Sequence, residues 1–295
     1  MTGRFIDNIK YSLKKNSIIN RSVNWSSNIE LIQTDFGKIR VLDTKGEKPV
    51  IINAPDGPNV IEHHEELILE LSKNFRVICF EFPGIGYSYP SSRFDYSLEN
   101  GAGLIINLLK VLHINCASLS FSCSNGLYAV KAAEIVPEKF NHLFLAQTPS
   151  MFSMKNWTDT NIPKLLTVPI IGQLASPKIG RVMANKWHKH AIPSGKNVIK
   201  FKEMAVYSLD NDGCFCLSSL VQGLSKDLKM KLLASKVSST LIWGNKDISH
   251  KKTDCNSINE HLPNCKVVEF KDCGHFPELE KTIEYVSLIN ETLKN

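Results

Sequence analysis

One stretch of the sequence combines a reactive side chain with a local structure that would expose it. Residues 115–137 (NCASLSFSCSNGLYAVKAAEIVP) predict a short apolar strand over 117–121, a tight turn of small residues, and a helix that begins near Gly126. A nucleophile at the apex of such a turn is raised above the sheet, and the helix N-terminus directs backbone N–H groups at charge that forms there. We place Cys123 at the apex, and Ser122 is the alternative nucleophile.

The segments around this stretch alternate between strands and helices. Such alternation, with helices long enough to cross a sheet, implies a mostly parallel sheet that is covered on both faces. In chain order the pattern predicts a helix and irregular lead-in over 1–27, a β-hairpin from Ile29 around Gly37, strands at 50–52, 76–82, 142–146, 240–243 and 266–270, and helices at 61–73, 96–112, 255–262 and 277–293.

The alternation stops over residues 149–235, which contain short helical pieces, several prolines and no clear strand. We predict that this segment is a helical cap inserted after the sixth strand, with residues 1–148 and 236–295 forming the α/β core. Ligands of such sheets bind beyond the carboxyl ends of the strands, and a cap in this position would cover them.

Composition narrows the possible partners. The chain has 295 residues, is 43% hydrophobic and carries a net charge of +6 without a basic run, which argues against nucleic-acid binding. No apolar run is long enough to span a bilayer and the N-terminus lacks the apolar core of a signal peptide, so we expect no stable membrane insertion and a cytoplasmic location. The eight cysteines are then expected to be free thiols.

Metal-binding residues do not stand out in the sequence. Cys214 and Cys216 lack partners at zinc-site spacing, and no cysteine or carboxylate accompanies the histidines of 63–64 and 187–190. We expect these histidines to lie on the solvated surface. We expect neither a metal nor an organic cofactor.

Four separated motifs, the turn included, resemble the α/β-hydrolase family in the branch with a helical cap. LSKNFRVICFEFPGIGYS (71–88) is similar to the family segment that ends in PG-x-G-x-S, and TLIWGNKD (240–247) resembles the strand that ends in the acid of the catalytic triad. FKDCGHFPELEK (270–281) resembles the segment that supplies the histidine, and the order nucleophile, acid, histidine is that of the family. The resemblance runs from about Lys48 to the C-terminus and implies the α/β-hydrolase fold, with a mostly parallel central sheet flanked by helices.

The same resemblance bears on the register of the turn. Family members place a proline fourteen residues after the nucleophile, and Pro137 stands in that position relative to Cys123. The family's Gly-x-Ser-x-Gly is absent, because Phe121 and Asn125 replace the glycines, which predicts a crowded or reshaped turn. Ser122 stays open as the alternative, since both residues two places away from it are small serines.

By this resemblance the catalytic residues are Cys123, Asp247 and His275. His275 would take the proton of the thiol, and Asp247 would hold the imidazole in the required tautomer. The acyl group would pass through a thioester on Cys123, which can be transferred to water, an amine or an alcohol. Hydrolysis of a carboxylic ester or thioester is the leading hypothesis, beside acyl transfer or cyclisation and beside an inactive binding module.

The oxyanion hole departs from the family pattern. One donor is expected to be the N–H of Ser124, directly after the nucleophile. The second comes from His-Gly-x in the family, where this chain has Asn53, Ala54 and Pro55, and proline has no N–H. Either Asp56 or Ala54 is therefore expected to donate instead through a shifted loop, or the oxyanion hole is incomplete. Loss of one donor would cost about 10²–10³ in rate.

The expected partner is a small-molecule or carrier-bound acyl substrate. No feature of the sequence predicts an oligomeric state. We expect the substrate pocket to be lined by Asn53, Pro55, Phe121, Trp157 and Trp187.

Overall fold

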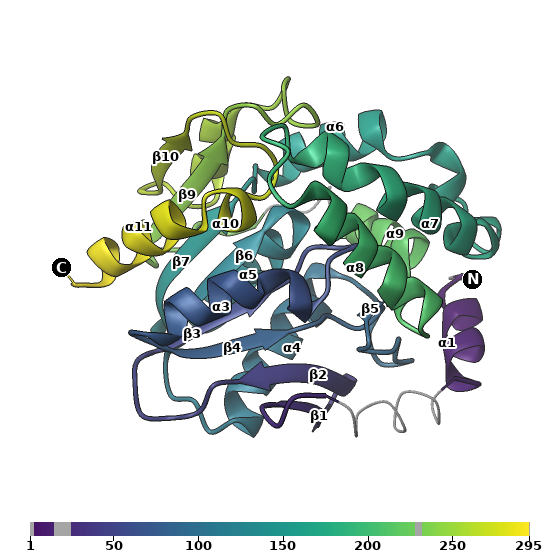
Figure 1. Ribbon diagram of the computed structural model, residues 1–295, viewed down its shortest axis with the longest axis horizontal. Coiled ribbons are helices and arrows are strands. Elements are labelled where there is room, and N and C mark those ends of the chain that lie inside the picture. The colour runs from purple at the N-terminus through teal and green to yellow at the C-terminus, as the bar shows by residue number, and fades with distance from the viewer. Residues whose placement is uncertain (1–2, 15–24, 228–231, 295) are drawn as a thin grey trace.

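A central sheet of eight strands organises the molecule (Figure 1). The computed structural model describes residues 3–14, 25–227 and 232–294, so part of the irregular lead-in predicted over 1–27 lies outside the described residues. The strands of this sheet are β1 (Ile29–Thr34), β2 (Gly37–Asp43), β3 (Val50–Ala54), β4 (Arg76–Phe80), β6 (Ala117–Ser122), β7 (Phe140–Ala146), β9 (Ser239–Gly244) and β10 (Lys266–Phe270).

The strand order is β1-β2-β4-β3-β6-β7-β9-β10. The predicted hairpin is present, with β1 and β2 antiparallel and Thr34 opposite Gly37, whose φ of 120° favours glycine. β2 also pairs with β4 in the antiparallel sense, and from β4 to β10 all neighbours are parallel. The chain runs outward from β3 to β4 and then returns to β6 on the other side of β3. In open parallel sheets this switch point is where ligands bind.

Helices cover both faces of the sheet, because the buried strands are apolar on both sides. One face packs against α4 and α5, and the other against α3 and α11 (Figure 1). Ser97 caps α4, since its side chain accepts a hydrogen bond from the N–H of Asn100. The helical elements of the core are α1 (Arg4–Ser12), η1 (Ile61–His64), α3 (Glu65–Ser72), α4 (Leu98–Val111), α5 (Cys123–Ile135), η2 (Pro137–Lys139), η4 (Cys255–Glu260), α10 (Pro277–Glu280) and α11 (Thr282–Lys294).

A mostly helical segment connects β7 to β9 and lies to one side of the sheet (Figure 1). Its last helices pack against each other around the buried side chains of Leu166, Phe215 and Leu217. None of the described helices has the length and apolar character needed to cross a bilayer. The segment consists of α6 (Met151–Asn161), η3 (Lys164–Thr167), α7 (Ile171–Ala191), α8 (Val198–Asp210), β8 (Cys214–Phe215) and α9 (Leu217–Asp227).

Four local predictions were wrong. The helix after the turn begins at Cys123 instead of Gly126, so the turn is tighter than expected. The segment 149–235 does contain a strand, because β8 pairs with β5 (Ile85–Gly86) from the loop after β4. The helix expected over 255–262 is the 3₁₀-helix η4, and the C-terminal helix is divided into α10 and α11.

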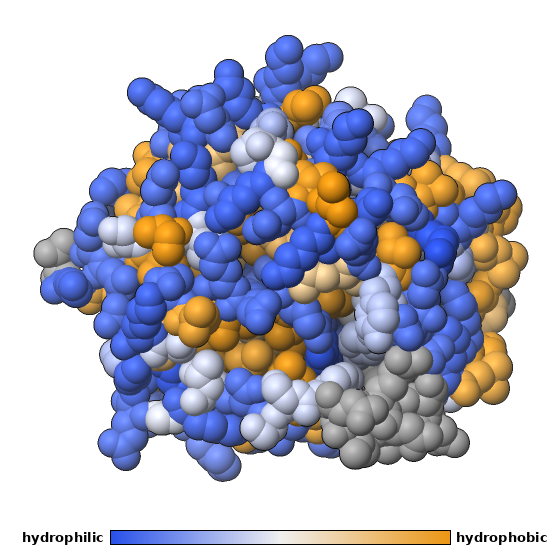
Figure 2. Space-filling view, in the orientation of Figure 1, coloured by the Kyte–Doolittle hydropathy of each residue, from blue (hydrophilic) through white to orange (hydrophobic). Residues whose placement is uncertain are grey.

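The outer surface contrasts with this apolar interior. On the face shown in Figure 2, hydrophilic residues predominate and hydrophobic residues form separate patches. The histidines of 63–64, which were expected at the surface, are buried, as is His188. That expectation was wrong because the rings of His63 and His188 stack on each other between the core and α7.

Candidate active site

The strand β6 passes into helix α5 without an intervening loop. Ser122 ends the strand in an extended conformation, and Cys123 starts the helix with a φ of 52°, which is strained for a residue other than glycine. Two contacts hold this conformation. The hydroxyl of Thr148 donates to the carbonyl of Cys123 (3.0 Å), and Nδ2 of Asn125 donates to the carbonyl of Pro55 (3.1 Å). Asn125 therefore ties the turn to the loop after β3 and does not crowd it.

The two candidate nucleophiles point in different directions. The hydroxyl of Ser122 donates to Oε1 of Glu278 (2.6 Å) and lies among buried groups near α10. Cys123 lines a pocket together with the neighbouring Ser124 and with His275. The geometry thus favours Cys123 over Ser122 as the residue that a ligand can reach.

Asp247 lies in the loop after β9, where five donors contact its carboxylate. One of them is the backbone N–H of His250, which donates to Oδ1 (3.4 Å). The N–H and the hydroxyl of Ser249 each donate to Oδ1 (2.8 Å). Nε2 of Gln147 donates to Oδ2 (2.6 Å), and the amide oxygen of Gln147 accepts from the N–H of Gly244 at the end of β9. Nδ1 of His275 contacts the same Oδ2 at 2.6 Å. Sequence reasoning did not find Gln147, although its position directly after β7 placed it at the carboxyl edge of the sheet.

His275 lies in the loop after β10, and its backbone is fixed by the segment between β7 and β9. The N–H of His275 donates to the carbonyl of Ala191 at the end of α7 (2.8 Å). Gly274 allows this close approach, because a Cβ there would lie 2.1 Å from the same carbonyl oxygen. The ring of Trp187 meets the ring of His275 edge-on, with centroids 5.3 Å apart.

The three predicted triad residues are brought together. Sγ of Cys123 and a ring nitrogen of His275 lie within 4.8 Å of each other, and the opposite side of the ring contacts Asp247. Nε2 of His275 is buried and has no hydrogen-bond partner among the described residues. It is therefore free to exchange a proton with a group in the pocket.

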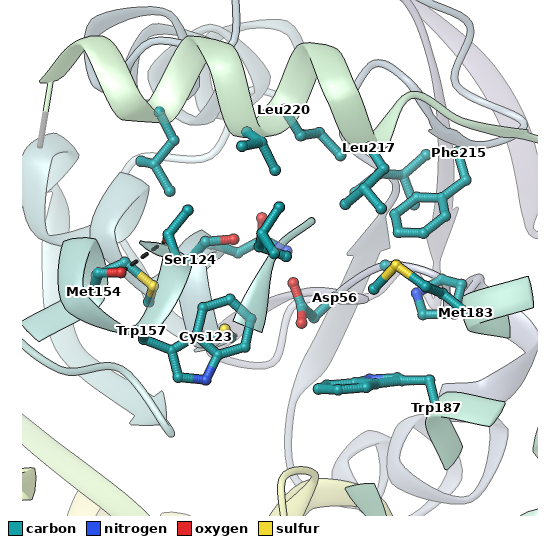
Figure 3. A pocket seen from close by; sticks show the side chains of 18 of the residues that line it. Asp56, Cys123, Ser124, Met154, Trp157, Met183, Trp187, Phe215, Leu217 and Leu220 are labelled. Carbon is teal, nitrogen blue, oxygen red and sulfur yellow. Dashed lines mark hydrogen bonds between the residues drawn. The ribbon is translucent and has the colours of Figure 1, made fainter. Parts of the chain in front are cut away.

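The pocket lies between the carboxyl ends of β3 and β6 and the segment between β7 and β9 (Figure 3). Trp157 of α6 and Trp187 of α7 are on its wall, as expected. Most of the other side chains that this segment adds to the wall are apolar. The apolar ones are Met154, Ile162, Met183, Phe215, Leu217, Leu220, Val221 and Leu224.

Known proteins resemble this chain in structure but not in sequence. No protein-family model matches the sequence, and no curated protein matches it. Solved structures do match. An epoxide hydrolase from Vigna radiata superposes with a TM-score of 0.72 at 18% identity, over 92% of this chain and 99% of the other. Epoxide hydrolase A from Mycobacterium thermoresistibile gives 0.77 at 10% identity (90% and 98%), and the enol-lactonase from Burkholderia xenovorans gives 0.69 at 15% identity (90% and 100%). This chain has the α/β-hydrolase fold. The fold predicted from the separated motifs is thus confirmed.

Several predictions about the lining of the pocket were wrong. Asn53 is buried within β3 and does not line the pocket. Ala54, which was expected as a possible oxyanion donor, pairs with Phe121 of β6 and is also absent from the pocket wall. Phe121 points into the core, where its ring contacts those of Phe80 and Phe82. Pro55 is also absent from the pocket wall, and its carbonyl is bonded to Asn125.

The loop after β3 instead presents the side chain of Asp56 to the pocket (Figure 3). Its Oδ2 lies 3.8 Å from Nε2 of His275. The backbone N–H of Asp56 was expected as a possible oxyanion donor, and no role was predicted for its side chain. The neighbouring Gly57 also lines the pocket. Ser124, the other predicted donor, lies in the pocket wall at the start of α5.

Burial and charge shift the pKa values of these groups in opposite directions. Burial and the charge of Asp56 raise the pKa of Cys123, although His275 and the N–H of Ser124 oppose the rise. Burial alone would lower the pKa of His275, but the charge and hydrogen bond of Asp247, with help from Asp56, hold it well above its ordinary value. Despite its burial, Asp247 has a lowered pKa, because His275 and Gln147 stabilise its ionised form. Asp247 thus stabilises the charged form of His275, which is the form that would hold a proton taken from Cys123.

His250 is a second histidine at the site that sequence reasoning missed. Cys123, His250 and His275 each place a nitrogen or sulfur within 4.8 Å of the other two, which is the donor type that zinc prefers. Nδ1 of His250 contacts the hydroxyl of Thr253, and its buried Nε2 has no partner among the described residues. The group shares Cys123 and His275 with the candidate triad, so it is not a separate site.

Proposed function

We propose that this chain is an enzyme that acts on a carboxylic ester or thioester through Cys123, with His275 as general base and Asp247 as the acid that orients it. One observation carries the proposal. The 2.6 Å contact of Nδ1 of His275 with Asp247 leaves Nε2, which has no other described hydrogen-bond partner, beside the Cys123 thiol. A base held by a third group next to a nucleophile is the arrangement that nucleophilic acyl transfer requires.

The reaction would proceed in two half-reactions. In the first, the thiol proton of Cys123 moves to Nε2 of His275, Sγ bonds to the carbonyl carbon, and the leaving alcohol or thiol departs with that proton. The N–H of Ser124 at the helix N-terminus would stabilise the developing oxyanion. In the second, an acceptor gives its proton to His275 and attacks the thioester, which releases the acyl group and restores the thiol.

The segment 149–235 would serve as the cap of this site. Its apolar side chains, such as Met154 and Leu217, line the wall opposite Cys123 and suit the hydrocarbon part of a small-molecule or carrier-bound acyl substrate. The same apolar wall favours acyl transfer or cyclisation as the second candidate function, because excluding water protects a thioester from hydrolysis.

Intact-protein mass spectrometry tests the proposal. Purified protein is exposed to a panel of acyl esters and acyl thioesters, and wild type is compared with Cys123→Ala, Ser122→Ala and His275→Ala. We expect one acyl adduct per chain, absent only from Cys123→Ala and formed more slowly in His275→Ala. Decay of the adduct with and without added amines or alcohols distinguishes hydrolysis from transfer.

Two outcomes would contradict the proposal. An adduct that is lost only in Ser122→Ala would assign the nucleophile to Ser122, against the contact of that hydroxyl with Glu278. The absence of an adduct with every donor would support a binding module that retains the fold without the chemistry.

A further inference from the structure

The pocket contains one carboxylate in an otherwise apolar wall. Among the described residues that line it, Asp56 is the only acidic one, and neither lysine nor arginine is present. An ionised carboxylate is costly to bury unless it is paired, and burial raises the pKa of Asp56 accordingly. Oδ2 is 3.8 Å from Nε2 of His275, which is longer than a hydrogen bond. The pocket therefore holds a carboxylate whose one cationic neighbour among the described lining residues is His275, at a distance longer than a hydrogen bond.

This carboxylate opposes the chemistry proposed for the site when the substrate is neutral. Besides burial, the charge of Asp56 is what raises the pKa of the Cys123 thiol, so it disfavours the thiolate. It would also repel the oxyanion that forms beside Ser124. A positive charge on the substrate, placed next to Asp56, would offset both effects.

Two indole rings line the same cavity, and one face of the Trp157 ring stacks on His250. In Figure 3 the carboxylate of Asp56 points into the cavity, with Trp157 and Cys123 on one side and Trp187 and Met183 on the other. The face of an indole ring attracts cations, most strongly where water is excluded. A carboxylate beside two tryptophans and apolar side chains matches an ammonium group that carries alkyl substituents.

We propose that the substrate carries a compact alkylammonium group that binds between Asp56 and the rings of Trp157 and Trp187, while its acyl carbon reacts with Cys123. This inference rests on the proposed acyl chemistry and specifies its substrate class. Asp56 supplies charge recognition and lies on the loop after β3, whereas the two tryptophans come from α6 and α7.

A pair of esters with the same shape isolates the charge. Choline butyrate and 3,3-dimethylbutyl butyrate differ in one atom, a quaternary nitrogen in place of a carbon. We expect wild type to acylate Cys123 from the choline ester with a kcat/KM about tenfold to a hundredfold higher. Asp56→Asn keeps the side-chain shape and removes the charge, so the ratio should fall at least about fivefold. The matched control is Asp159→Asn, which removes the same charge from an exposed position of α6 and should leave the ratio unchanged.

A binding measurement separates this inference from the acyl chemistry. Quenching of tryptophan fluorescence by tetramethylammonium is titrated in wild type, Asp56→Asn and Asp159→Asn. Saturable binding that Asp56→Asn weakens at least about fivefold supports the cation site even if neither ester acylates Cys123, in which case only the proposed function fails.

Acylation without preference for the choline ester, or a preference that Asp56→Asn leaves intact, overturns the inference while the proposed function stands. Absence of saturable tetramethylammonium binding to wild type, when no ester acylates the protein, overturns it as well. If Asp56→Asn does not fold, the ester ratio and the titration of wild type still decide between these outcomes.

Discussion

Oδ2 of Asp247 lies 2.6 Å from Nδ1 of His275, and each of the two side chains is 1% exposed. Ser249 and Gln147 donate to the same carboxylate, so hydrogen bonds other than the one with His275 already hold Asp247 in position. The contact determines which nitrogen of His275 is directed to the pocket. The first two predictions concern this arrangement.

Asp247→Asn should slow acylation of Cys123 by about 10³-fold or more. An amide at this position can donate to Nδ1, which would favour the wrong tautomer of His275 and would no longer stabilise its charged form. The measurement is the rate at which the acyl adduct forms on Cys123 at a saturating concentration of the acyl ester or thioester. Asp254→Asn and Asp272→Asn change the nearby exposed aspartates and serve as controls, and a comparable loss in either would refute the assignment of the acid.

Gln147→Leu should lower the rate of acylation by about tenfold to a hundredfold, the usual cost of losing a hydrogen bond to a charged group. Gln147 bonds to Asp247 and not to the ligand, so it is a positioning residue. We expect kcat to fall with KM nearly unchanged, and the pH at which His275 titrates to shift. A loss of thermal stability with an unchanged pH profile would show a merely structural role.

Glu278→Gln should make stability less sensitive to rising pH. Burial raises the pKa of Glu278 to about 7 despite the hydrogen bond from Ser122. Because the folded pKa exceeds the ordinary value, the protonated form stabilises the fold at low pH, and this contribution is lost as pH rises to about 7 and above. Between pH 5 and pH 8 the variant should gain about 2 to 3 kcal/mol relative to wild type in urea unfolding. An identical pH dependence of the two proteins would contradict the prediction.

His64→Leu should change how the stability of the protein depends on pH on the acidic side. Burial, together with the neighbouring His63, lowers the pKa of His64 to about 3, and both of its ring nitrogens lack partners among the described residues. The unfolded chain therefore binds this proton at a higher pH than the folded chain, and wild type loses stability as pH falls below about 6.5. From pH 7.5 to pH 5 the variant should gain about 2 kcal/mol relative to wild type.

The matched control for this last measurement is His113→Leu, since His113 lies in the loop after α4 and is exposed. A gain in this control equal to that of His64→Leu would show that the change does not come from the burial of His64. If His64→Leu loses as much stability as wild type when the pH falls from 7.5 to 5, a group other than His64 causes the loss.

The sequence by itself determined the order of strands and helices, the hairpin and the positions of the three triad candidates. Each depends on a local pattern. Apolar periodicity sets a strand or a helix, and small residues between a strand and a helix set the turn at Cys123. The resemblance of the motifs that end at Asp247 and His275 added the catalytic order, and these residues meet because parallel strands present their carboxyl ends at one edge.

The tertiary structure decided which side chains face the pocket. Successive residues of a strand point to opposite faces, so Phe121 enters the core while Ser122 is directed to Glu278, and no local signal in the sequence specified which face was which. Asp56 and Gln147 acquire their roles only through neighbours that are distant in sequence, His275 and Asp247. Such contacts depend on how the loops after β3, β7, β9 and β10 pack beneath the segment between β7 and β9. That packing involves residues from distant parts of the chain, so no local sequence pattern specifies it.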